Sequence, residues 1–436
     1  MTGPMTSATE VPSRSRRRWR WRWVFGLRAL MVLVLLIGGG LGWCLQQARE
    51  RRADLATIAA GGGQVVFRDT DARETGWRVR LYHRTGFGFV REVQGVSLDD
   101  EAIPPGPIPR SVRRDAAFAA IGRLGRVDFV FVQNGPVTPA HLAALATTRL
   151  TRLVLVTVPE VSAAVLAEVA RLSTLTDLRL TRPQVKLPLA AVRAAAALTR
   201  LEHLDLHGFA RLEPADLAPL RRLDRLQSLA ISPAPTDEAV LDLLAGMPAM
   251  TSLELFRTQV TDAALRRLVA AMPHLEHLAV DGSRLTDAGI EALATLPNLK
   301  EMVVTSRCRA EIGSLGRLTD RSLVALGRCR RLSALMLHGG RFTDAGLGAL
   351  QGLPLRTLVV GSITTVSPPT LARVVTGPSW NLLGLHGPGI TDASLPTLAA
   401  VVNPATCLDL QDAAITDAGA AQLATLPVRA LWRGGR

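Results

Sequence analysis

Lysine and tyrosine are nearly absent from this chain of 436 residues. Lys186 and Lys300 are the only lysines among 51 basic residues, and Tyr82 is the one tyrosine. Of the net charge of +14, residues 1–28 supply +6, from seven arginines against Glu10. The remaining charge is spread thinly, and no basic and aromatic module of the kind that binds nucleic acid is present. We therefore expect no nucleic-acid partner.

Cysteine is also scarce, and its spacing excludes the common cysteine-based sites. The four cysteines include no C-x-x-C pair, so the chain has neither a zinc-ribbon nor a thioredoxin motif. Cys44 lies in an apolar segment. Cys308 and Cys329 bracket the one irregular stretch of the repeat described below, and they either pair or remain free buried thiols.

Motifs for catalysis and metal binding are missing as well. The chain has no Walker loop, no G-x-S-x-G turn and no dinucleotide fingerprint. His203, Asp205 and His207 alternate along one predicted strand, and the two histidines lie about 13 Å apart. That separation is too long for one metal ion, whose bonds to protein ligands are about 2 Å. The sequence therefore predicts no enzyme, no metal and no cofactor.

Leucine, in contrast, recurs at a regular spacing. From Leu150 onward the pattern L-x-x-L-x-L returns, with most starts 23 to 26 positions apart, and each predicted strand is followed by apolar residues at helical spacing. Such a unit cannot bury its own leucines, whereas stacked units share one core. The sequence predicts an α/β solenoid, a horseshoe with a parallel sheet on its concave face and helices on its convex face. The pattern starts at Leu150, Leu175, Leu201, Leu226, Met250, Leu275, Leu299, Leu332, Leu355, Trp380 and Ala405.

A Thr-Asp pair opens many of the helical stretches. Threonine is a good N-cap, and a carboxylate in the first turn is favoured by the helix dipole. A ladder of aspartates that binds cations is the alternative, and we favour the capping interpretation. The pairs start at Thr236, Thr261, Thr286, Thr319, Thr343, Thr391 and Thr416.

Residues 275–290 and 332–347 share a longer pattern, in which the leucines are followed by T-D-A-G. This pattern resembles the cysteine-containing and ribonuclease-inhibitor-like branches of the leucine-rich repeat superfamily. Cys329, three positions before Leu332, lies where the cysteine-containing subtype has its cysteine. The resemblance implies a leucine-rich repeat solenoid that binds a protein on its concave face.

The amino-terminal end predicts a membrane anchor. Ala29–Leu45 is an uncharged apolar run, and with the residues before it the segment approaches the ~20 residues that a bilayer crossing needs. Arginines alternating with tryptophans precede it, as in a positive flank with an interfacial aromatic belt. More arginines precede the run than follow it, so we expect a single-pass inner-membrane protein with a cytoplasmic N-terminus and periplasmic repeats. A cleaved signal peptide is the alternative.

The predicted domains follow from these boundaries: a basic cytoplasmic tail at 1–23, a transmembrane helix at 24–45, a linker and capping region at 46–126, and a leucine-rich repeat domain at 127–436. The first seventy residues resemble the head of bacterial single-anchor repeat proteins, which supports this topology. Gly38 and Gly42 form a G-x-x-x-G spacing, which permits self-association of the helix in the bilayer.

The concave strand positions are the candidate binding surface, because residues between the core leucines point into the hollow. They form a polar and acidic patch with one aromatic anchor, which suits a protein or peptide better than a polyanion. We expect a non-catalytic recognition protein; the alternative is a structural protein of the cell envelope without a discrete ligand. The candidate residues are Asp205, His207, Glu254, Phe256, His277 and Asp281.

Overall fold

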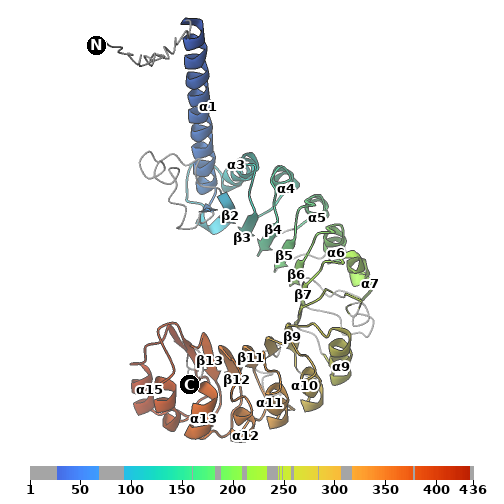
Figure 1. Cartoon of the computed structure of the whole chain (residues 1–436), viewed down its shortest axis with the longest axis vertical. Helices are drawn as coiled ribbons and strands as arrows, with labels where there is room; N and C mark the ends of the chain where they lie inside the picture. Colours follow the sequence, from blue (N-terminus) through green and yellow to red (C-terminus); the bar gives the residue numbers. More distant parts are fainter. Residues whose placement is uncertain are drawn as a thin grey trace, which may run out of the picture.

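The protein, analysed as a computed structural model, folds into a horseshoe in which one curved sheet lines the inner face and helices cover the outer face (Figure 1). This confirms the predicted α/β solenoid. The structure describes residues 27–67, 93–159, 161–181, 188–208, 214–232, 244, 246–247, 249–256, 260–282, 284–305, 317–376 and 379–432.

Within the described residues, fifteen strands form a single sheet in sequential order. Only the β1–β2 pair is antiparallel there, and every later pair is parallel. The strands are β1 (Gly63–Phe67), β2 (Val93–Asp99), β3 (Phe129–Gln133), β4 (Arg152–Val156), β5 (Asp177–Thr181), β6 (His203–His207), β7 (Ser228–Ser232), β8 (Ser252–Leu255), β9 (His277–Asp281), β10 (Glu301–Thr305), β11 (Ala334–Leu337), β12 (Thr357–Val360), β13 (Leu382–Leu385), β14 (Cys407–Asp409) and β15 (Ala430–Trp432).

The helices on the convex side are short, except for the first. All except α1 lie in the connections between consecutive parallel strands, which is the crossover that parallel pairing requires. They are α1 (Leu27–Ala60), η2 (Asp100–Ala102), α3 (Arg110–Arg123), α4 (Pro139–Leu145), α5 (Ala163–Val169), α6 (Pro188–Ala196), α7 (Pro214–Leu217), η3 (Ala218–Arg222), α9 (Asp262–Ala271), α10 (Asp287–Leu293), α11 (Asp320–Leu326), α12 (Asp344–Gly348), α13 (Pro368–Val375), η5 (Asp392–Ser394), α14 (Leu395–Ala399) and α15 (Asp417–Leu423).

The core is a continuous column of the pattern leucines. Leu275, Leu278 and Val280 are buried in one repeat, and the equivalent positions are buried in its neighbours. One position differs from the sequence prediction. Ala405 is exposed, whereas Thr406 is buried and its hydroxyl donates to the carbonyl oxygen of Trp380. In that repeat a hydrogen-bonded threonine replaces the first leucine.

The N-terminal end of the core is closed by β1 and by the last turns of α1. Ile58 of α1 is fully buried, and Arg123 of α3 contacts Asp54 of α1 at 2.6 Å between Nη2 and Oδ1. Helix α1 ends at Gly61-Gly62, where Gly62 has a φ of 77° that favours glycine. The sheet continues across the predicted boundary at residue 126, because β2 pairs in parallel with β3.

Helix α1 spans the segment predicted to cross the membrane, and its free end projects away from the solenoid (Figure 1). Across the residues that the structure describes, no helix is both long and apolar enough to cross a bilayer. The transmembrane helix therefore stays a prediction, as does the division into four domains. The tail at 1–23, Cys308 and the Thr236-Asp237 pair lie outside the described residues.

The predicted capping role of the Thr-Asp pairs is confirmed for most of them. The side chains of Thr261, Thr286, Thr319, Thr343 and Thr416 each accept a hydrogen bond from a backbone N–H in the first turn of their helix. Thr391 is the exception in the described pairs, because it precedes a 3-10 turn and makes no such bond.

The aspartate of each pair has a second role that the sequence did not reveal, because it binds the cap of the next repeat. Oδ1 of Asp320 accepts the backbone N–H of Thr343 at 2.8 Å, and Oδ2 accepts its hydroxyl at 2.5 Å. Asp262 binds Thr286 in the same way. The pairs therefore form a ladder along the convex side, in which the caps at Thr286, Thr319, Thr343, Ser367 and Thr416 are each held by an aspartate of the preceding repeat. Asp417, in the last helix, has no following cap to hold.

The ladder explains on steric grounds why glycine occupies the fourth position of the T-D-A-G pattern. A Cβ on Gly346 would lie 2.3 Å from Oδ1 of Asp320 in the preceding repeat, closer than such atoms approach. Where glycine is replaced, a hydroxyl takes part instead: Ser322 donates to Asp287 at 2.5 Å, and Thr370 donates to Asp344 at 2.8 Å. The position accepts a residue that either leaves room for the carboxylate or donates to it.

We predict that Asp287→Ala lowers the free energy of unfolding by about 1–2 kcal/mol. Asp287 accepts three hydrogen bonds from Thr319 and Ser322, and a charged hydrogen bond that is partly screened by solvent contributes on this order. Urea denaturation measures the loss. Asp417→Ala is the matched control, because Asp417 occupies the same cap position in the last helix and is exposed. An equal loss in both variants would contradict the ladder.

The difference in unfolding free energy between wild type and Asp287→Ala should depend on pH. Burial raises the pKa of Asp287, but the hydrogen bonds from Ser322 and Thr319 outweigh it, so the pKa is lowered below its usual value. A carboxylate with a lowered folded pKa stabilises the fold fully above its unfolded pKa of about 3.9, and this contribution disappears as the pH falls through the folded pKa. The gap between wild type and Asp287→Ala should be full at about pH 7 and much smaller at about pH 2.

Candidate functional site

The concave face is ordered in rows, because parallel pairing aligns equivalent positions of successive strands. One row contains Arg179, Asp205, Ala230, Glu254 and Ala279, from β5 to β9. The side chains of this row alternate in direction with the buried leucines. Asp205 and Glu254 therefore stand on either side of Ala230, with no long side chain between them.

Asp205 and His207 form a tight pair at the end of β6. Oδ1 of Asp205 lies 2.5 Å from Nδ1 of His207 and also accepts the backbone N–H of His207 at 3.0 Å. Because a carboxylate only accepts, Nδ1 carries the proton. The imidazole ring lies against Phe256, with ring centroids 5.4 Å apart. Asp205, His207, Glu254 and Phe256 together are called the central patch.

The charges of the central patch shift each other's pKa values. Burial lowers the pKa of His207, but the hydrogen bond and charge of Asp205 and the charge of Glu254 raise it above its ordinary value. The pKa of Glu254 is raised, first by burial and then by Asp205, against the opposing effects of His207 and Arg179. The patch thus holds two half-buried carboxylates and an imidazole that favours the charged form.

The structure places the other two candidate residues apart from this patch. His277 begins β9 and its Nδ1 lies 3.1 Å from Oε2 of Glu301 on the next strand. Asp281 ends the same strand and is only 2 % exposed. Strand alternation alone assigns this position to the hollow, but Asp281 is buried and has interactions within the fold.

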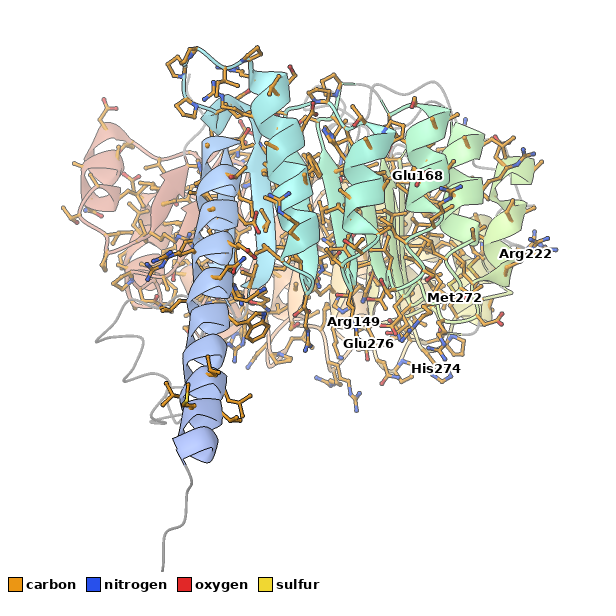
Figure 2. All side chains as sticks on the ribbon, turned by 90° about the horizontal axis from the view of Figure 1, so that it is seen from above. Arg149, Glu168, Arg222, Met272, His274 and Glu276 are labelled. Carbon is orange, nitrogen blue, oxygen red and sulfur yellow. The ribbon has the colours of Figure 1, made fainter. Side chains whose placement is uncertain are left out.

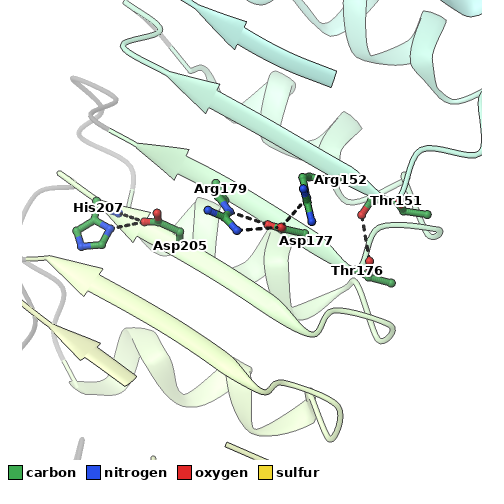
Figure 3. Close-up of polar contacts among 7 residues, drawn as sticks. All are labelled: Thr151, Arg152, Thr176, Asp177, Arg179, Asp205 and His207. Carbon is green, nitrogen blue, oxygen red and sulfur yellow. Dashed lines mark hydrogen bonds and ion pairs between the residues drawn. The ribbon is translucent and has the colours of Figure 1, made fainter. Parts of the chain in front are cut away.

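A neighbouring cluster was missing from the candidate list. Asp177 is 3 % exposed and lies between two arginines, with Arg152 at 2.8 Å and Arg179 at 3.0 Å (Figure 3). Figure 3 shows both guanidinium groups directed at the same carboxylate, next to the Asp205–His207 pair. Arg152, Asp177 and Arg179 are called the arginine bridge. The arginine bridge becomes visible only from the register between β4 and β5, which places Arg152 opposite Asp177.

Among the described residues, no group of three His, Cys, Asp or Glu side chains is placed to hold a metal ion. Cys329 is buried and burial raises the pKa of its thiol to about 11, so it is unreactive near neutral pH. The central patch and the arginine bridge offer charge, hydrogen bonds and one aromatic ring to a ligand.

Comparison with known proteins supports the repeat class. The family model described as "Leucine Rich repeat" matches residues 271–294 and 406–424. A search of curated proteins finds no match to the chain. The two matched segments, which contain β9 with α10 and β14 with α15, are similar to leucine-rich repeats, and the same strand-and-helix unit recurs along the described sheet. The finer branch within the superfamily is not resolved by this match.

Three solved structures are similar to the chain at low identity. An internalin from Listeria monocytogenes is 16% identical, covering 82% of this chain and 95% of its own, with a TM-score of 0.43. A leucine-rich repeat protein from Leptospira interrogans is 15% identical, covering 69% and 75%, with a TM-score of 0.39. The Toll–Spätzle complex of Drosophila is 14% identical, covering 78% and 43%, with a TM-score of 0.41. These likenesses say nothing about the function of the chain.

We predict that Asp205→Asn lowers the pKa of His207. The substitution removes the hydrogen bond to a carboxylate and its charge, while the burial that lowers the pKa remains. The pKa should therefore fall, because only the charge of Glu254 then opposes the effect of burial. A pH titration of the His207 ring by NMR measures the change. Glu276→Gln, at the opposite end of the strands, is the control; an unchanged pKa in Asp205→Asn would refute the pairing.

Proposed function

We propose that the concave face binds a protein or peptide partner and that the central patch is the centre of that interface. The observation that supports this is the rigid arrangement of Phe256 against His207, which Asp205 holds by two hydrogen bonds. Side chains that are fixed before binding lose less entropy on binding. Aromatic anchors surrounded by polar groups are typical of energetically important interface positions.

The negative charge of the central patch favours a partner that presents a basic group. Glu254 carries a raised pKa because it is half-buried and lies near Asp205. A basic group on the partner relieves this repulsion, whereas a polyanion increases it. The T-D-A-G pattern and the buried Cys329 support, as a finer proposal, the cysteine-containing or ribonuclease-inhibitor-like branch.

We expect the double variant Glu254→Ala, Phe256→Ala to reduce partner binding at least tenfold while the fold stays intact. An aromatic anchor contributes about 2 kcal/mol or more, which corresponds to more than tenfold in Kd. The purified repeat region serves as bait on cell-envelope extract, and the captured partner is titrated against both forms. Glu168→Ala, Arg222→Ala on the convex side is the matched control (Figure 2).

The outcomes separate the proposal from its alternative. Full-strength binding by the concave double variant, with loss in the convex control, would place the interface on the helices. A bait that captures no saturable partner would favour a structural role in the envelope. Circular dichroism melting of each variant shows whether a loss of binding reflects unfolding.

We further propose that α1 anchors the chain in a lipid bilayer. The apolar run Ala29–Leu45 supports this, and Leu35 is 71 % exposed in a helix that projects from the solenoid. In Figure 2 the free end of α1 extends past the edge where Arg149 and His274 precede their strands. That edge would then face the membrane. Self-association through Gly38 and Gly42 belongs to this proposal, since no described atom lies within 4 Å of a Cβ built on either glycine.

We predict the topology from the arginine asymmetry. A tag placed after Arg436 should be digested when protease is added to spheroplasts, while a tag before Met1 should be protected. Immunoblotting of both tags gives the result. Digestion of the N-terminal tag alone would reverse the proposed orientation, and release of the chain by carbonate washing would argue against an anchor.

A further inference from the structure

A second hollow lies far from the central patch, at the C-terminal ends of β11 to β14. Its volume is about 600 Å³, within the range of roughly 300–1,000 Å³ that is usual for small-ligand sites. The residues that the argument uses are His338, Arg341, Ser362, His386, Gln411 and Asp412. They follow their strands, so the hollow lies at the strand ends opposite to the edge of Arg149 and His274, past which the free end of α1 extends (Figure 2).

The hollow results from the turns that follow the strands. Gly340, Ser362, Gly387 and Asp412 all have φ values in the left-handed region, between 55° and 145°. Backbone approaches backbone here: a Cβ on Gly387 would lie 2.5 Å from the carbonyl oxygen of Ile363. Serine and aspartate pay an energetic cost for this conformation, which persists only where the surrounding structure fixes it.

Two imidazoles line the middle of the hollow, and one of them, His386, lies beside the half-buried carboxylate of Asp409. Oδ2 of Asp409 accepts the amide N–H of Gln411 at 2.9 Å and lies 3.2 Å from Nε2 of His386. The rings of His338 and His386 are 6.5 Å apart. Burial, and then the proximity of His386, lower the pKa of His338, so this ring is neutral at pH 7. A neutral imidazole both donates and accepts hydrogen bonds.

The side chains of His386 and Asp409 include buried polar atoms that lack hydrogen-bond partners among the described residues. Nε2 of His386 and Oδ1 of Asp409 are buried, and neither forms a hydrogen bond with any residue that the structure describes. The two side chains approach to 3.2 Å between Nε2 of His386 and Oδ2 of Asp409 without hydrogen-bond alignment. Buried polar atoms without partners are rare and destabilising. This group of side chains is therefore not explained by stability.

Opposite charges mark the two ends of the hollow. Arg341 follows β11 and Asp412 follows β14, and both side chains are exposed. Three strand steps separate them, about 14 Å at the backbone. An extended peptide rises about 3.4 Å per residue, and the two side chains reach toward the hollow. A ligand of about three residues therefore fits between them.

We propose that this hollow binds a short peptide with free termini, whose carboxylate pairs with Arg341 and whose ammonium group pairs with Asp412. The imidazoles of His338 and His386 hydrogen-bond to the peptide groups between them. An apolar ligand does not fit, because no aliphatic or aromatic hydrocarbon side chain other than a proline lines the hollow. An anion alone does not fit either, because Asp412 and Asp409 would repel it.

The test uses trialanine in four forms with the full chain: free, N-acetylated, C-amidated, and blocked at both ends. We expect saturable binding of the free form by calorimetry, a loss of about tenfold when either end is blocked, and larger loss when both are. In Arg341→Gln amidation should no longer matter, while acetylation still does. In Asp412→Asn acetylation should no longer matter, while amidation still does. Asparagine tolerates the φ of 57° at this position.

Two controls make the result decisive. His207→Ala changes the central patch and should leave trialanine binding unchanged, whereas His338→Ala should weaken all four forms. Equal binding of free and doubly blocked trialanine would overturn the proposal. So would the absence of binding by the free form, or binding of maltotriose in its place, since a neutral saccharide would use the imidazoles without the two charges. None of these outcomes bears on the partner of the central patch.

Discussion

The structure depends on one constraint, which is that no repeat can complete its own packing. The pattern leucines of one unit are covered by those of the next, and the aspartate of one helix cap is satisfied by the threonine of the next cap. Apolar burial supplies most of the stabilisation but is nondirectional. The Asp–Thr contacts are directional, because two oxygens of one carboxylate meet an N–H and a hydroxyl at the start of the following helix. Burial therefore stacks the repeats, and the ladder sets their register.

The fold was predictable from sequence to the extent that it is periodic. The spacing of leucines predicts the strands, and burial of Leu278 and Val280 follows from strand alternation. The spacing does not show that Asp320 reaches Thr343, because that contact joins two positions in different repeats. The glycine of T-D-A-G could be read from the sequence only as a small residue. Its cause, the carboxylate of the preceding repeat, becomes visible once the register is known.

The candidate site shows the same limit. Alternation predicts that Asp205 and Glu254 face the hollow, and both do so at half-buried positions. It does not determine which neighbours pair. Asp177 was not selected, although it holds two arginines, and Asp281 was selected, although it is buried. A strand pattern gives the direction of a side chain, whereas its partner depends on residues one repeat away.

Stacking also separates the two proposed binding surfaces. The central patch lies on β6 and β8, the hollow lies beyond β11 to β14, and β9 and β10 stand between them. In a solenoid each repeat contacts only its neighbours, so a local change at one surface reaches the other only through intervening repeats. Those repeats are held by buried leucines and by the Asp262–Thr286 and Asp287–Thr319 contacts, which allow little displacement. The fold thus allows both proposals to hold for one rigid chain, with a wide polar surface for a large partner and a narrow charged hollow for a small ligand.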